Sequence, residues 1–295
     1  MMRKFNRRLP ALAVALVAAT VSGPDVALAR EENQPGVFIE EELRQPTEPG
    51  IRVDGYLNAE YNAHFVSYGR DVWNGGSDWS DSAVGTFNPS AQILVKSKLV
   101  DGYAGIWMDV NKNSDFPEAG SNIQEIDTWL GLSFRPGRFT IAATYLQYRF
   151  RDQSENVYNA WLSYSDRGQL FDKFGLNPSL LVHFRRDGEF RQDGNAMVLG
   201  LSPWFTLTKR SSFPISLTIP VRFGFLEEGY HGGDGGFGYA SIESLFVFSM
   251  NKNPAASFRW NINAGLTYYM TDKDVIPTNP DANFLTGSLG LSLNF

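Results

Sequence analysis

Cysteine is absent from the 295 residues of this chain, and no long hydrophobic run interrupts its middle. Without cysteine there is no disulfide, no thiolate metal site and no lipid-acceptor residue of a lipoprotein. The longest apolar run lies at the extreme N-terminus, so membrane-spanning helices are excluded elsewhere. Disorder is also excluded, because 7 Trp, 12 Tyr and 22 Phe are far more aromatic residues than an unfolded chain carries.

Residues 1–29 have the pattern of a secretory signal peptide. Four basic residues lie within the first eight positions, an apolar stretch follows over residues 9–21, and Ala27-Leu28-Ala29 is a small-x-small motif. We expect export with cleavage after Ala29, and an uncleaved anchor is the alternative. Removal of this basic segment makes the mature chain more acidic than the net charge of −6 of the full sequence. This charge argues against nucleic acid as a partner.

Residues 30–49 are rich in glutamate and proline and show no helical or strand period. This composition predicts an acidic periplasmic arm. A plug or a partner-docking segment is the alternative interpretation.

From Ile51 the sequence alternates with a period of two. Apolar residues alternate with polar or charged ones over residues 51–65, and the same pattern returns over residues 285–295. Because successive side chains of a strand point to opposite faces, both segments read as strands with one face suited to lipid. The last strand ends on Phe295, which resembles the assembly signal of bacterial outer-membrane barrels. A secreted β-sandwich is the alternative for this last strand.

Further alternating segments lie between these two ends. We expect strands at residues 91–96, 103–110, 125–134, 139–148, 157–164, 178–185, 196–207, 215–225, 240–248 and 258–270. Pro203 predicts a bulge or a strand end. Long polar connections at 66–88, 112–122, 226–238 and 271–282 alternate with short ones, except for the long connection at 165–176.

These features predict an all-β fold: a transmembrane, antiparallel, up-and-down β-barrel of about 12 strands, formed by residues 50–295. Long extracellular loops and short periplasmic turns are typical of barrels in the outer membrane of Gram-negative bacteria. The expected partners are therefore the lipid bilayer of the outer membrane and the outer-membrane assembly machinery, which would read the C-terminal strand.

The predicted inward face carries charges of both signs. The candidate pore-lining residues are Arg52, Asp54, Glu60, Lys96, Lys98, Asp109, Glu125, Asp127, Arg185, Arg222, Glu243 and Arg259. Such a set could form a constriction that selects small polar or charged solutes. It could equally form a network of ion pairs that only satisfies buried charges.

The 3 histidines give no metal or hydrolase motif. The alternation points His64 and His183 inward, and His231 lies in a glycine-rich connection. There is no Gly-x-Ser-x-Gly motif, and His64 with Asp71 is the only candidate for an acid–histidine pair at the rim. We expect no enzymatic activity, no cofactor and no metal. Aromatic residues of the first long loop, Tyr68 and Trp73 among them, could bind sugars or cations or could cap the mouth.

Several short motifs carry a family resemblance. They are Val66-Ser67-Tyr68-Gly69, Asn88-Pro89-Ser90, Gly102-Tyr103-Ala104-Gly105-Ile106-Trp107, Glu125-Ile126-Asp127, Tyr145-x-x-Tyr148 and Tyr158-Asn159-Ala160. With these motifs the segment 65–165 resembles an uncharacterised family of exported proteobacterial proteins, the TorF-like porins. A Phe-Arg-Gly string of the family is missing from the first loop. The resemblance implies an outer-membrane barrel with a porin-like role and supplies no substrate and no catalytic residue.

The sequence therefore predicts a porin-like channel for small polar or charged solutes. The alternatives are a closed structural or interaction barrel with partner-binding extracellular loops and, third, a barrel hydrolase.

Overall fold

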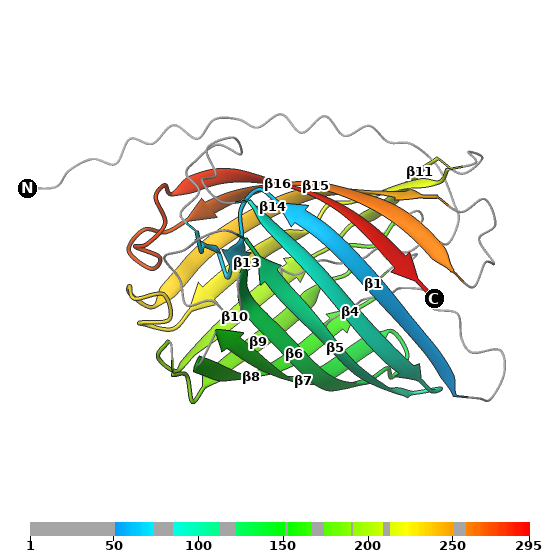
Figure 1. Ribbon diagram of the computed structural model, residues 1–295, viewed down its shortest axis with the longest axis horizontal. Coiled ribbons are helices and arrows are strands. Elements are labelled where there is room, and N and C mark those ends of the chain that lie inside the picture. Colours follow the sequence, from blue (N-terminus) through cyan, green and yellow to red (C-terminus); the bar gives the residue numbers. More distant parts are fainter. Residues whose placement is uncertain are drawn as a thin grey trace, which may run out of the picture.

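Figure 1 shows the chain as a computed structural model, in which long strands surround a common axis. The structure describes residues 51–73, 85–111, 122–150, 153–166, 174–189, 191–208, 213–250 and 258–295. The predictions of a signal peptide over residues 1–29 and of an acidic arm over residues 30–49 lie outside these residues.

The described strands form one closed antiparallel barrel. The wall strands are β1 (Arg52–Asn62), β4 (Thr86–Lys96), β5 (Val100–Val110), β6 (Ile123–Phe134), β7 (Phe139–Phe150), β8 (Gln153–Tyr164), β9 (Ser179–Arg186), β10 (Gly194–Leu201), β11 (Trp204–Thr208), β12 (Ile215–Thr218), β13 (Val221–Leu226), β14 (Gly236–Ser249), β15 (Arg259–Thr271) and β16 (Asn283–Asn294). Sequence neighbours pair along the wall, and β1 pairs with β16, with Tyr56 opposite Asn294. This pairing and that of β14 with β15 close the barrel, and β11 pairs with β12 alone among the described strands.

Two of the wall strands are interrupted at prolines. β10 and β11 follow one another across Ser202 and Pro203, and β12 and β13 follow one another across Ile219 and Pro220. A proline has no N–H to donate to the ladder, which ends the regular pairing there. Its carbonyl still accepts: the Ile219 N–H donates to Pro203 O at 2.9 Å. Counted as continuous, the wall has twelve strands, as predicted, and the break near Pro203 is confirmed.

The sequence prediction missed two details of the wall. The segment 215–225 was expected to be one unbroken strand, but it is divided at Pro220. The first strand was expected to reach Phe65, but it ends at Asn62, and residues 63–65 are all buried because the chain turns inward there. The described residues of the connection between β8 and β9 contain no extra pair of strands, and the even count stands.

The outer face of the barrel is apolar over its middle and aromatic toward both ends. Leu130 and Leu132 on β6 are exposed to more than 60% at mid-wall. Exposed aromatic side chains flank this band at Tyr61, Phe87, Phe134, Phe139, Phe237, Phe258, Trp260, Tyr268 and Phe295. Such a band between two aromatic girdles is the surface that an outer-membrane barrel presents to lipid. Among the residues described, no helix is long and apolar enough to cross a membrane.

The two ends of the barrel differ in their connections. We call the end that carries the β1–β4, β5–β6, β13–β14 and β15–β16 connections the loop end, and the opposite one the turn end. The first and last strands meet at the turn end, where Gly55 and Phe295 exchange backbone hydrogen bonds of 2.8 and 2.9 Å. A Cβ on Gly55 would lie 2.5 Å from the Phe295 ring, so only glycine lets the terminal aromatic side chain pack against β1.

Candidate functional site

A short hairpin from the β1–β4 connection lies inside the barrel. Its strands are β2 (Val66–Ser67) and β3 (Arg70–Asp71), and we call residues 66–71 the inner hairpin. Tyr68 and Gly69 form its turn with positive φ angles of 48° and 77°, as a two-residue hairpin turn requires. A Cβ on Gly69 would lie 2.6 Å from the ring of Tyr239 on the barrel wall, so the glycine also permits close packing.

Polar contacts fasten the inner hairpin to the wall and to a second connection. The Tyr68 hydroxyl lies 2.6 Å from His183 Nδ1 on β9. His64 Nδ1 lies 2.9 Å from Asp71 Oδ2. Asn279, in the β15–β16 connection, donates to Gly69 O and accepts from the Asp71 N–H, both at 2.8 Å. The acid–histidine pair expected from the sequence is therefore real, and its position shows a structural use: it holds the hairpin.

Two further connections fold over the inner hairpin at the loop end. Tyr230, from the β13–β14 connection, packs edge-on against Tyr68 at 5.6 Å between ring centroids. The adjacent His231 is buried, as is Ile276 from the β15–β16 connection. Tyr68 itself is 2% exposed. The loop end of the lumen is therefore filled by ordered segments of the chain.

Acidic and basic side chains lie on different parts of the wall beside the hairpin. Asp109 on β5 and Glu125 and Asp127 on β6 are buried on one side, and Arg185 on β9 is buried on the other. Since the hairpin brings Arg70 to the basic side, a transverse electric field is expected across the lumen at this level.

Arg191 links the two sides. It belongs to the β9–β10 connection, and its Nε lies 2.9 and 3.0 Å from the carboxylate oxygens of Glu155 on β8, with Nη2 at 2.5 Å. Glu155 has no exposed surface. A two-pronged pair of this kind fixes both groups in position as well as pairing their charges.

Asp109 anchors the chain that follows the inner hairpin. It accepts hydrogen bonds from Trp73 Nε1 at 3.1 Å and from the hydroxyl of Thr86, and Asn111 Nδ2 lies 3.0 Å from its second oxygen. Of the first-loop residues singled out in the sequence, Tyr68, Asp71 and Trp73 thus all point into the barrel. Residues 74–84 lie outside the described part of the chain.

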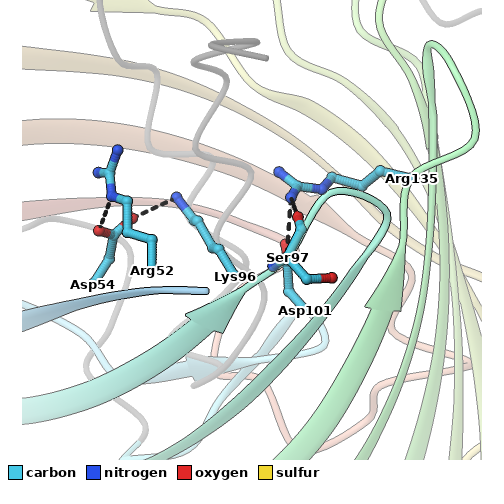
Figure 2. Close-up of polar contacts among 6 residues, drawn as sticks. All are labelled: Arg52, Asp54, Lys96, Ser97, Asp101 and Arg135. Carbon is cyan, nitrogen blue, oxygen red and sulfur yellow. Dashed lines mark hydrogen bonds and ion pairs between the residues drawn. The ribbon is translucent and has the colours of Figure 1, made fainter. Parts of the chain in front are cut away.

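The turn end of the lumen carries a smaller ionic cluster, shown in Figure 2. The Asp54 carboxylate accepts from Arg52 and pairs with Lys96 Nζ at 2.9 Å. Beside it, Arg135 from the β6–β7 turn pairs with Asp101 at 2.9 Å. The described cluster therefore holds three cations and two carboxylates, an excess of one positive charge.

Between the two ends, Arg222 on β13 faces Glu243 on β14. Their nearest nitrogen and oxygen atoms lie 3.7 Å apart, beyond hydrogen-bond distance. A cavity of about 30 Å³ borders this pair and His64. One water molecule needs roughly 10–15 Å³ of such a cavity, so there is room for a few small polar groups.

The structure places most of the predicted charged residues on the inner face. Buried there are Asp54, Glu60, Asp109, Glu125, Asp127, Arg185, Arg222 and Glu243. Lys96 and Arg259 are partly exposed, and Arg52 is exposed at the turn end. Lys98 departs from the expectation, because it lies in the exposed turn after β4 rather than on the inner face.

Sequence reasoning missed four residues that shape the site. Arg70, Arg191 and Asn279 lie in connections, where the period of two no longer predicts a direction, and Glu155 precedes the segment expected as a strand. The Tyr68-Gly69 pair is the only signal that could have indicated a tight turn in the first connection.

Comparison with known proteins gives similarity of fold. A scan of protein-family models and a search of curated proteins find no match. Among solved structures, an outer membrane channel from Pseudomonas putida F1 is 9% identical with a TM-score of 0.47, covering 87% of this chain and 100% of that one. The NanC porin is 9% identical with a TM-score of 0.42, covering 83% and 98%. The closed antiparallel barrel is established by the strand pairing of this chain itself, and its resemblance to the TorF-like porins stays a prediction.

Proposed function

We propose that the protein is an outer-membrane channel for small polar solutes whose loop end is closed by the inner hairpin in the conformation described. The loop end would face the extracellular side and the turn end the periplasm. Export would depend on residues 1–29, with cleavage after Ala29, and residues 30–49 would form a periplasmic arm.

One observation carries the proposal: the inner wall bears buried polar atoms without protein partners. Among the described residues no hydrogen bond reaches Thr206 Oγ1, Thr218 Oγ1, Ser241 Oγ, Asn263 Oδ1 or His64 Nε2. A solid protein core satisfies nearly all of its buried polar groups. Polar atoms aimed at an axial water path are satisfied by that water, so the pattern supports a hydrated lumen.

The filled loop end favours a second candidate, a closed barrel that only presents its loops to a partner. Tyr68, Tyr230 and Ile276 are as deeply buried as residues of a permanent core. In that case the polar inner wall would have no transport role.

Conductance across a planar bilayer tests the proposed channel. We expect the purified, folded chain to give intermittent ion-conducting openings, because the hairpin is held by a few polar contacts. Arg222→Gln should then shift selectivity toward cations and Glu243→Gln toward anions, since each change removes one fixed charge from the lumen. Arg149→Gln is the matched control, because this arginine is exposed on β7.

Absence of openings in both the folded wild type and a variant lacking the inner hairpin would favour the closed barrel. Unchanged ion selectivity in both lumen variants would mean that Arg222 and Glu243 form an ion pair with only a structural role.

A further inference from the structure

Three arginines lie near the contact between the inner hairpin and the wall, where Tyr230 packs against Tyr68 and accepts a hydrogen bond from Arg185. Arg70 comes from the hairpin, Arg185 from β9 and Arg191 from the β9–β10 connection. Of these, only Arg191 has a carboxylate partner, Glu155. Within the described ranges, neither Arg70 nor Arg185 forms an ion pair, and the nearby Asp71 is engaged by His64.

Hydrogen bonds orient Arg185 and engage two of its three guanidinium nitrogens. Its Nε donates to Gln192 O and its Nη2 to Tyr230 O, both at 2.8 Å, and its guanidinium lies 4.2 Å above the Tyr230 ring. Its Nη1 is buried without a hydrogen-bond partner in the described part of the chain, and Arg185 is 1% exposed. A buried guanidinium donor left unpaired is costly, so a partner for it is expected.

Arg70, on the hairpin side of the contact, also has a buried nitrogen without a hydrogen-bond partner among the described residues. This nitrogen is Nε, and the side chain as a whole is half-buried. Arg191 keeps 19% of its side-chain surface exposed. Solvent, and therefore a solute, reaches the edge of the cluster.

The charges of the arginines affect the protonation of their neighbours. Burial, together with the charges of Arg191 and Arg185, lowers the pKa of Arg70. Burial and the charges of all three arginines also hold the pKa of His231 well below its usual range. Like charges held together in a low-dielectric site repel, and an anion placed among them would relieve that repulsion.

We propose that Arg70 and Arg185 bind the oxyanion group, carboxylate or phosphate, of an anionic solute where the inner hairpin meets the wall. This inference rests on the proposed function and narrows its solutes to small anions. Guanidinium donors in a fixed plane suit the paired oxygens of both groups. Occupation would give the hairpin an ionic contact to the wall in addition to the hydrogen bond between Tyr68 and His183.

Equilibrium binding to the full chain in detergent tests this site without requiring transport. The probes are inorganic phosphate, glucuronate as a carboxylate, and glucose as the uncharged control. Titration calorimetry measures the binding of each. We expect saturable binding of phosphate or glucuronate, and which of the two binds identifies the oxyanion source. Arg70→Gln should weaken that binding at least about tenfold, because it removes a charge-assisted hydrogen bond.

Arg70→Gln is the main variant because it alters the hairpin and leaves the wall strands intact, and Arg185→Gln is the second. Arg149→Gln, an exposed arginine on β7, should bind like the wild type. Three results would each overturn the site: no saturable binding of either anion to folded protein, equal binding by Arg70→Gln and Arg149→Gln, or binding of glucose as tight as that of glucuronate. Binding is measured independently of conductance. A protein that conducts but binds no anion would therefore contradict this site and leave the proposed channel function intact.

Discussion

We expect excision of the inner hairpin to turn the proposed channel from one that opens intermittently into one that conducts continuously. Replacing residues 66–71 by two glycines removes Tyr68 from its contact with His183 and Asp71 from its contact with His64. The wall strands are untouched by this change, since β1 ends at Asn62 and β4 begins at Thr86. We therefore expect a several-fold rise in mean conductance and a loss of closures in planar bilayers.

Two variants control for the excision. Replacement of residues 76–81 by two glycines shortens the same connection by the same length and leaves the inner hairpin in place, so the wild-type closures should persist. Tyr68→Phe removes only the hydroxyl that meets His183 and should give an intermediate open fraction, because one neutral hydrogen bond contributes about 1 kcal/mol. Equal conductance of the hairpin excision and the 76–81 excision would show that the hairpin does not close the lumen.

Loss of the Glu155 carboxylate is expected to be the most destabilising single change in the lumen. Glu155 is fully buried, and both of its carboxylate oxygens accept hydrogen bonds from Arg191. Burial alone would lower the pKa of Arg191, but the carboxylates of Glu155 and Glu125 outweigh burial and raise it. Glu155→Gln leaves a buried guanidinium without its partner, which should reduce the free energy of unfolding by about 3–5 kcal/mol.

Urea titration of the protein in lipid vesicles, followed by tryptophan fluorescence, measures this effect. The double variant Glu155→Gln/Arg191→Gln should recover a large part of the loss, because no unpaired charge remains. Arg52→Gln is the matched control: its partner Asp54 keeps Lys96, and the Arg52 side chain is 61% exposed, so a change of about 0–1 kcal/mol is expected. A Glu155→Gln variant as stable as Arg52→Gln would mean that the buried pair adds nothing.

The barrel could be predicted because its strands obey one simple rule. On β1, Asp54, Tyr56, Glu60 and Asn62 are buried and Leu57 is exposed, as the period of two required. The break at Pro220 escaped notice because the apolar alternation continues on both sides of it. Within a strand, then, the direction of each side chain follows from its position alone.

The interior could not be predicted in the same way. The contacts of Arg191 with Glu155 and of Asn279 with Gly69 join residues that are far apart in sequence, and each involves a connection without a regular period. The inner hairpin depends on such contacts rather than on its own sequence, since a hairpin this short is not stable alone. The buried charges of the wall could therefore be predicted from the sequence, and the inner hairpin that lies between them could not.

Access to one introduced cysteine tests the central claim, a water path from the turn end that the inner hairpin blocks. The chain has no native cysteine, so Asn263→Cys on the inner face of β15 would be the only thiol. A small charged thiol reagent would be applied to either side of the protein reconstituted in one orientation, and labelling followed by mass spectrometry. We expect fast labelling from the turn end, slow labelling from the loop end, and fast labelling from both after hairpin excision. No labelling from either side, or equal labelling from both with the hairpin intact, would contradict it.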